Sequence, residues 1–367
     1  MDLNLYVFDS SITPLGVIDV VTGLTWLEKF SDAGNFELWC PLNDQNAELL
    51  QEDNLLWIGG ESAGVIEFKE LTSDENATKT IHIKGRLAES YLDYRTIYPT
   101  ISMTGRISDI VRKHVYNNLI NPTDEKRKIP LVELASPQTA YGPSVSHQKT
   151  GDTVLSEVSK LCEANSLGFR LQFLPRLKKF VFKVYQGTDR TIEQSSNDPV
   201  LLSSDLDDVL ESTYSHNKSE LRNFAYVAGE DSGSSRKVQT IGSATGLSRR
   251  ELFVDARDLQ SENDDGTTVS DSEYASMLIE RGKTSLEDYK DIESFSATLR
   301  TFGTTGYTYG VDFFLGDTVT VYDSRLKVKT NAIVTEALKT YDEDGEHLDI
   351  TFGYEQPTVA DKLKRRS

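Results

Sequence analysis

The sequence has few of the residues that mark disulfide-stabilised or metal-binding proteins. Its 367 residues include only two cysteines and five histidines. Cys40 and Cys162 are far apart and lie in apolar surroundings. A disulfide framework is therefore not expected, and both residues should be buried thiols that pack as small hydrophobic groups.

Targeting and membrane-spanning segments are also missing from the pattern. The first residues, MDLNLYVFD, have no basic region followed by an apolar one, so no secretory signal is predicted. No apolar run approaches the roughly 20 residues that cross a bilayer, so no membrane anchor is predicted. We expect a product that is made and kept in a cytosol, at least until assembly or lysis.

Basic residues are scarce relative to acidic ones. The chain has 39 Lys and Arg against 58 Asp and Glu, a formal net charge of −19. Such a surface repels phosphate, which disfavours sequence-independent nucleic-acid binding and attachment to anionic membranes. It would suit a channel through which nucleic acid slides without sticking. The 38% hydrophobic content is enough for ordinary cores, and the length suggests two or three domains.

Motifs for catalysis and metal binding are absent from the sequence. It has no nucleophile elbow, Walker loop or dinucleotide fingerprint. Two acidic turns, residues 261–266 and 342–345, fail as calcium loops because the first and twelfth positions are not carboxylates. The histidines form no pair at metal-ligand spacing: His82, His114, His147, His216 and His347. We therefore predict no catalytic, cofactor-binding or metal-binding residues.

Two other functions stay open as alternatives. Asp255 and Asp258 could serve a glycosidase only if a cleft held them a few ångströms apart. The simpler interpretation is a solvated acidic face, or salt bridges with Arg249, Arg250 and Arg257. A glycan-binding module could stack sugars on tryptophans. However, Trp26, Trp39 and Trp57 all lie in N-terminal strand patterns, where packing in a barrel core or a subunit interface is favoured.

Hydrophobic periodicity predicts alternating β and α+β regions. Alternation over residues 3–7 and 81–84 predicts strands, with a short helix at 43–51. Helical spacing follows at 105–121 and at 152–165, where Gly168 is the expected stop. A hairpin is predicted at 169–184 and a strand at 223–229. A capping box, Ser270 to Glu273, should begin the last helix, and Asp344-Gly345 should turn a final hairpin.

The N-terminal and C-terminal β regions look alike. Each has an Asp-led strand, at 53–57 and at 317–321, then a strand ending in leucine, an acidic loop and a last strand that ends at glycine. This pattern indicates a duplicated β-domain. Two copies in each of three chains would give a pseudo-sixfold ring.

Six short segments, in this order, resemble the tail-hub family of siphophages and prophages, which is related to the N-terminal part of tail-associated lysins. They are GNFEL at 34–38, IKGRL at 83–87, NPTD at 121–124, GFR at 168–170, RRELFVDARDLQ at 249–260 and YGVDF at 309–313. Each is weak alone, but the ordered set covers essentially the whole chain.

The resemblance implies an α+β, multidomain fold with two tube-like antiparallel β-barrel domains and two peripheral α+β domains. The barrels would be residues 1–94 and residues 205–245 with 295–357. The peripheral domains would be 95–204 and 246–294, and 358–367 would be a basic C-terminal tail.

The resemblance also implies a virion structural protein at the tail tip. It would be a homotrimeric baseplate hub that contacts the distal tail protein, the tape-measure protein and tip or receptor-binding proteins, with DNA passing through unbound. Many relatives continue into a peptidase, lysozyme-like or fibre domain. This sequence stops at the basic residues 362–367, so the expectation is a hub that is not an enzyme rather than a cell-wall endopeptidase or glycosidase.

Overall fold

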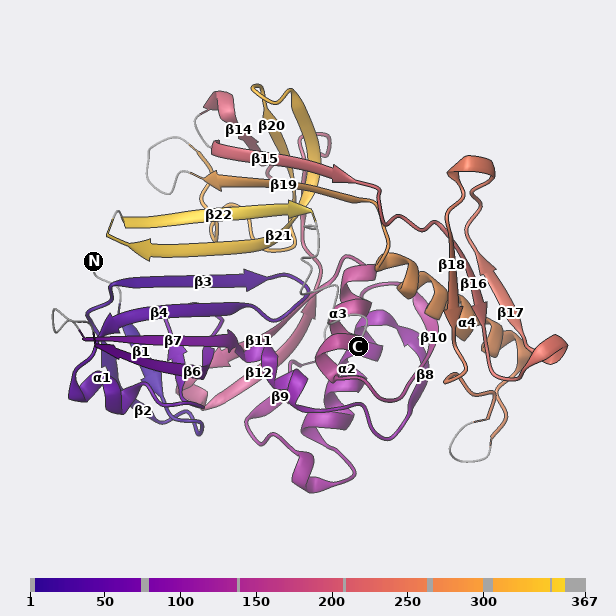
Figure 1. Ribbon diagram of the computed structural model, residues 1–367, viewed down its shortest axis with the longest axis horizontal. Coiled ribbons are helices and arrows are strands. Elements are labelled where there is room, and N and C mark those ends of the chain that lie inside the picture. The colour runs from indigo at the N-terminus through magenta and orange to yellow at the C-terminus, as the bar shows by residue number, and fades with distance from the viewer. Residues whose placement is uncertain are drawn as a thin grey trace. The chain divides into compact units, whose positions relative to one another are not determined.

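The computed structural model describes residues 4–73, 79–136, 139–206, 209–262, 267–299, 306–343 and 345–353 (Figure 1). The chain forms two compact units. The first comprises Met1–Gln186 and Leu338–Leu348, and the second Gly187–Ala337 and Asp349–Ser367. This mostly β, multidomain architecture has several separate sheets. The finer four-domain division stays a prediction, and the basic tail lies outside the described residues.

The first unit begins with an antiparallel sheet whose strand order is β3-β4-β7-β6-β5-β1-β2. Alternate residues of β4 point inward, and Phe36, Leu38 and Cys40 are buried. The short helix predicted at 43–51 is α1 (Asp44–Leu49), and the Asn43 side chain caps its first turn. The strands are β1 (Leu5–Phe8), β2 (Pro14–Ile18), β3 (Gly23–Lys29), β4 (Asn35–Pro41), β5 (Leu55–Trp57), β6 (Gly64–Ser73) and β7 (Lys79–Leu87).

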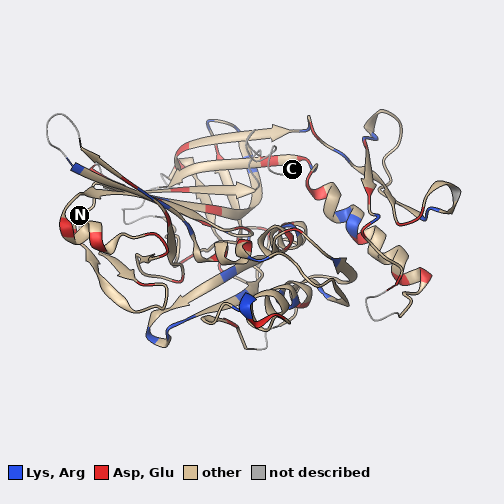
Figure 2. Cartoon of the chain, turned by 60° about the horizontal axis from the view of Figure 1, so that its bottom comes forward, with Lys and Arg blue, Asp and Glu red and all other residues tan. Residues whose placement is uncertain are grey.

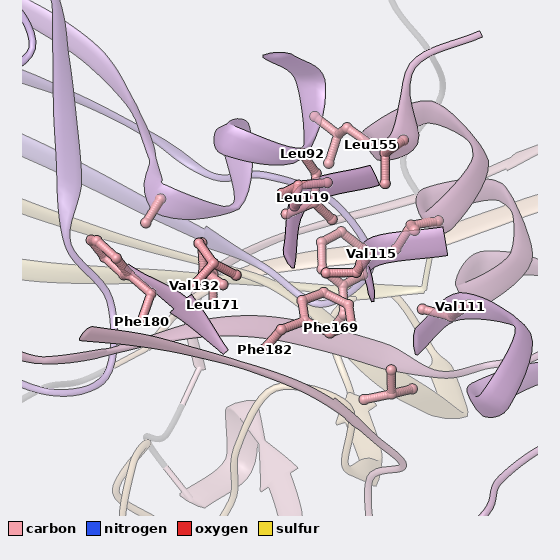
Figure 3. Packing of buried hydrophobic residues seen from close by; sticks show 14 of the residues in the cluster. Leu92, Val111, Val115, Leu119, Val132, Leu155, Phe169, Leu171, Phe180 and Phe182 are labelled. Carbon is pink, nitrogen blue, oxygen red and sulfur yellow. The ribbon is translucent and has the colours of Figure 1, made fainter. Parts of the chain in front are cut away.

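The rest of the first unit is an α+β layer. Helices α2 (Ile107–Val115) and α3 (Val154–Ala164) pack against the three-stranded sheet β11-β12-β9 (Figure 3). Its strands are β9 (Val132–Leu134), β11 (Gly168–Leu174) and β12 (Lys179–Tyr185), while β8 (Ile101–Arg106) pairs with β10 (Ser144–Lys149). Short helical turns occupy Ala88–Tyr94, Tyr116–Ile120, Glu125–Arg127 and Pro175–Leu177.

The helical faces predicted from spacing are confirmed. Every predicted apolar position of the two helices is buried: Ile107, Ile110, Val111, Val115, Leu119, Val154, Leu155, Val158, Leu161 and Cys162. Gly168 as the helix stop is wrong. The left-handed residue after α3 is Ser166, with φ of 51°. Gly168 instead begins β11, where a Cβ would lie 2.3 Å from Cε2 of Phe30.

The strands that build the second unit follow the order β15-β19-β22-β21-β20. Two short strands, β13 (Asp189–Arg190) and β14 (Leu201–Ser203), pair in parallel with β20. The other strands are β15 (Val209–Asn217), β19 (Ile292–Leu299), β20 (Thr318–Asp323), β21 (Val328–Asp342) and β22 (Gly345–Gly353), and Ser204–Leu206 form a 3-10 turn. The outer part of the β21–β22 hairpin, Leu338–Leu348, belongs to the first unit, where Tyr341 packs on the core.

A small α+β element lies between β15 and β19 in the chain. Strands β17 (Val238–Ile241), β16 (Phe224–Ala228) and β18 (Glu251–Asp255) form its sheet in that order, with 3-10 turns at Gly233–Ser235 and Gly246–Ser248. Helix α4 (Asp271–Glu287) packs on this sheet and carries charges of both signs along its length (Figure 2). As predicted, Ser270 caps this helix by accepting a hydrogen bond from the Glu273 amide at 3.2 Å. Strand β16 pairs with both β17 and β18, and among the described strands neither β16 nor β17 pairs with β15.

Two sets of five strands share one topology, which supports the predicted duplication. Strands β3, β4, β5, β6 and β7 correspond in order and neighbours to β15, β19, β20, β21 and β22. The fine register agrees as well. The Asp53 and Gly316 amides donate to the carbonyls of Ile66 and Val334, whose own amides donate to the carbonyls of Asn54 and Asp317.

The register corrects one detail of the predicted duplication. Asp53 and Gly316 both have positive φ, 68° and 91°. The structural counterpart of Asp53 is therefore Gly316, one residue before the Asp317 that the sequence pattern aligned with it. Only the hydrogen bonds across the sheet reveal this shift. Whether Asp53 is aligned with Gly316 or with Asp317, apolar residues of the first strand still match apolar residues of the second.

Candidate assembly surfaces and polar clusters

Residues 249–260, one of the six segments that resemble the tail-hub family, form part of the small α+β element between β15 and β19. The first half of this segment is β18, which runs parallel to β16, and the second half buries Ala256 and Leu259 under α4. The Arg249 guanidinium carbon lies 3.4 Å from the centroid of the Phe224 ring, a cation–π contact that holds the two strands together. The residues of this segment therefore contribute to the packing of this small α+β element.

The carboxylates singled out in this segment are engaged in ion pairs. Asp255 pairs with Arg236 and, at 3.3 Å, with Nε of Arg257. Asp258 accepts two hydrogen bonds from Arg281, at 2.9 and 2.8 Å. The predicted pairing with Arg257 is confirmed. The other two predicted partners lie elsewhere: Arg249 pairs with Glu251, and Arg250 donates to the Lys218 carbonyl.

The rare residue types lie in packed positions. Cys40 and Cys162 are both free and buried, as expected, and burial raises the pKa of the Cys40 thiol to about 11. Trp26 is 1% exposed and stacks on Phe36. Trp39 stacks on His82 with 4.6 Å between ring centroids, and Trp57 packs on the core beside Phe8 and Phe173. Trp39 and Trp57 are half-buried, so only Trp26 is fully packed.

A buried polar cluster connects α2, α3 and β10. His114 and His147 face each other with 3.0 Å between their Nε2 atoms, and His147 Nε2 lies 3.6 Å from Glu157 Oε1. Lys149 Nζ lies 3.2 Å from the other Glu157 oxygen. Burial, and then the neighbouring His147, lower the pKa of His114 to about 3. Sequence spacing missed this pair because its members are 33 residues apart.

A second buried cluster surrounds Arg170. Its Nη1 donates to the Ser62 hydroxyl at 2.9 Å and lies 3.7 Å from Glu28 and 3.6 Å from Glu89. Burial raises the pKa of Glu89, and the charge of Arg170 opposes that rise. The Leu171 amide donates to Glu89 at 3.1 Å, so the cluster fastens β11 to the turn Ala88–Tyr94. These contacts form a buried network of charges and hydrogen bonds, which makes the packing of these elements more rigid.

Neither cluster is arranged as a metal centre. Within the ranges that the structure describes, no group of three or more His, Cys, Asp or Glu side chains could hold an ion. Most of the acidic turn 261–266, and Asp344 of the other turn, lie outside those ranges. No described helix is both long and apolar enough to cross a membrane.

Two strand edges are the structural candidates for assembly. The outer half of β6, from Phe68 to Ser73, pairs only with β7 among the described strands, and β15 pairs only with β19. Apolar side chains are exposed on both edges: Phe68 and Leu71 on β6, and Leu210 on β15. Unpaired strand edges that expose apolar groups are sites for pairing with another chain.

The fold is similar to those of solved tail proteins, two of which come from prophages. A tail protein from Neisseria meningitidis matches with a TM-score of 0.59 and 14% identity, covering 97% of each chain. A 43 kDa tail protein of prophage MuSo2 from Shewanella oneidensis matches with a TM-score of 0.56 and 12% identity, over 95% of this chain and 98% of the other. Prophage tail protein gp18 from Listeria monocytogenes has a TM-score of 0.52 and 12% identity, over 98% of both chains.

The family comparison is more specific. The family model of the siphovirus ReqiPepy6 Gp37-like proteins matches residues 4–354, and the chain belongs to this family of phage tail proteins. No curated protein matches the chain. The resemblance to phage and prophage tail proteins drawn from the sequence is thereby confirmed.

Proposed function

We propose that this protein is the hub at the distal end of a phage or prophage tail, where it works as a structural element and not as an enzyme. Three chains would form a ring that extends the tail tube and connects it to the tip and receptor-binding apparatus. The observation that carries the proposal is the duplicated sheet, β3-β4-β7-β6-β5 and β15-β19-β22-β21-β20. Two copies in each of three chains provide six equivalent elements, which match a sixfold tube.

The pairing within one chain suggests how the ring closes. The outer part of β21, which belongs to the first unit, lies next to β3. In the duplicated arrangement β21 corresponds to β6, and β3 corresponds to β15. The same contact, made between chains, would join the free edge of β6 to the free edge of β15 in the next subunit. Such a head-to-tail contact closes into a ring when its rotation matches the symmetry.

The charge of the chain agrees with a conduit for DNA. With a net charge of −19, carboxylates facing a lumen would repel the phosphate backbone and let it pass. The expected neighbours are the distal tail protein, the tape-measure protein and tip proteins, in a virion tail that is assembled in the host cytoplasm. The two tube-like barrels and two peripheral domains belong to the same proposal.

The test is the oligomeric state of the chain, alone and with the distal tail protein. We expect light scattering to give a trimer and negative-stain images to show a ring with a central hole in at least one of these conditions. Leu71→Lys, on the β6 edge, should abolish the ring because it puts a charge into the strand contact. The control is Leu177→Lys, which changes another exposed leucine, in the β11–β12 turn. A wild-type chain that stays monomeric in both conditions would overturn the proposal.

A further inference from the structure

A basic pocket lies in the first unit, where the turn Ala88–Tyr94 comes close to the turn Glu125–Arg127. It is open and has a volume of about 400 Å³. Its lining consists of three cationic side chains, two tyrosines and a threonine: Arg95, Lys126, Arg127, Tyr94, Tyr98 and Thr96. Three adjacent cations are unexpected in a chain with so large an acidic excess.

Neutral backbone carbonyls hold the two guanidinium groups in position. Arg95 donates from Nε to the Arg127 carbonyl at 2.6 Å and from Nη1 to the Tyr94 carbonyl at 2.9 Å. Arg127 donates to the carbonyls of Thr96 and Tyr98 and, at 3.1 Å, to the side-chain oxygen of Asn118. These bonds fix the groups but leave other N–H donors on each, since a guanidinium has five. A ligand would therefore bind to N–H groups that are already held in place, which lowers the entropy cost of binding.

Among the described residues, no carboxylate forms an ion pair with the cations of the pocket, Arg95, Lys126 and Arg127. By contrast, the nearby Arg86 pairs with both Glu67 and Asp93. Burial and then repulsion from Arg127 lower the pKa of Arg95, as expected for cations that face each other without a counterion. An anion entering the pocket would remove this repulsion.

The two tyrosines give the pocket a second kind of binding surface. Tyr98 is 68% exposed and Tyr94 is 43% exposed, and both residues line the pocket. Aromatic faces beside hydrogen-bond donors suit a ligand that has one flat, weakly polar face and one charged group. A sugar ring that carries an acidic substituent has this character, whereas a bare inorganic anion would leave the rings unused.

We propose that this pocket binds a phosphorylated sugar, with the phosphate held by Arg95, Lys126 and Arg127 and the sugar ring against Tyr94 and Tyr98. Phosphate is preferred over carboxylate because it carries up to two negative charges and has enough oxygens to accept bonds from all three cations. Thr96 lies on the pocket wall, where its hydroxyl can meet a sugar hydroxyl. The proposal does not depend on the hub function, because it rests only on contacts within the first unit.

The test uses titration calorimetry of the full chain at about 150 mM salt, where long-range attraction is screened. The probes are glucose 1-phosphate, inorganic phosphate and glucose. We expect glucose 1-phosphate to bind more tightly than inorganic phosphate, and glucose alone not to bind. Lys126→Gln should weaken glucose 1-phosphate by about tenfold, the usual effect of losing a hydrogen bond to a charged group. Tyr98→Ala should weaken glucose 1-phosphate but leave inorganic phosphate unchanged.

Lys128→Gln is the matched control, because Lys128 is an exposed neighbour that carries the same charge and does not line the pocket. Thermal melts of each variant would verify that folding is unchanged. Equal weakening by the Lys126 and Lys128 variants would overturn the proposal, since it would indicate bulk attraction only. It would also be overturned if no phosphate probe bound, if both phosphate probes bound equally, or if Lys126→Gln changed only self-association, which would make an acidic protein surface the occupant.

Discussion

At the scale of single residues, the buried His114 makes the stability of the first unit depend on pH. Its pKa falls to about 3 in the folded chain, whereas an unfolded histidine titrates near about 6.5. Below that pH the unfolded state binds a proton that the folded state does not. Stability is therefore complete above about pH 6.5 and is lost as the pH falls from about 6.5 towards about 3.

We expect this residue to contribute about 2 kcal/mol of acid destabilisation at pH 5. Its charged neighbours, Lys149 and Glu157, lie across the cluster on β10 and α3. His114→Gln should flatten the fall in stability between pH 7 and pH 5, measured from thermal midpoints and hydrogen exchange in α2. His347→Gln, which changes an exposed histidine, is the control. If the two variants had the same pH profile, the assignment to His114 would be wrong.

The surroundings of a single residue were predictable where neighbours in the sequence determine them. Both cysteines lie in apolar stretches, and both are buried. The His114–His147 contact and the ion pairs of Arg170 could not be predicted, because they form when strands and helices far apart in the chain pack together. Arg170 and Ser62 are separated by 108 residues. No spacing rule connects such positions. The basic pocket was missed for the same reason, since it joins residues 94–98 to 126–127.

At the scale of elements, the start of α4 depends on one side chain. The Ser270 hydroxyl accepts a hydrogen bond from the Glu273 amide in the first turn of the helix, where amides need acceptors from outside the helix. Ser270→Ala should cost about 1 kcal/mol and speed hydrogen exchange in the first turn of α4. Ser276→Ala, within the same helix, is the control, because its hydroxyl only bonds back to the Ser272 carbonyl. Equal protection of the first turn in both variants would contradict a capping role.

The elements themselves were largely predictable because their signals repeat along the chain. Helical spacing located α2 and α3, and alternation located the β11–β12 hairpin. The prediction that Gly168 ends helix α3 is wrong. A glycine after a helix usually marks a left-handed turn, but here Ser166 takes that conformation. Gly168 is needed for a different reason, the close approach of Phe30, which only the folded structure reveals.

At the scale of the whole molecule, the duplication was visible in the sequence as a likeness between two acidic hairpins. Its full extent was not. The counterpart of the β3–β4 hairpin is split in the second copy, because residues 218–291 come between β15 and β19. The sequence therefore showed three similar strands and hid two. The strand order restores the match, since it depends on which strands pair and not on what separates them along the chain.

The proposed ring makes a prediction that distinguishes it from other assemblies. Thr72 is near the outer end of β6 and Thr213 is in β15, and each strand has an edge without a described neighbour. With Thr72→Cys and Thr213→Cys in one chain, a flexible bis-maleimide should link the β6 edge of each subunit to the β15 edge of the next. Denaturing gels should then show covalent dimers and trimers and nothing larger, because the third link closes the ring.

The single variants separate this arrangement from a two-fold one. If β6 meets β15, a chain with only Thr72→Cys or only Thr213→Cys has no cysteine opposite the one introduced and should stay unlinked. Strong dimers from one single variant would instead show that like edges meet, as in a two-fold contact, and a ring of this kind could not form. The native Cys40 and Cys162 do not confuse the result, because both are buried and burial raises the pKa of each thiol, which keeps them unreactive in the folded chain.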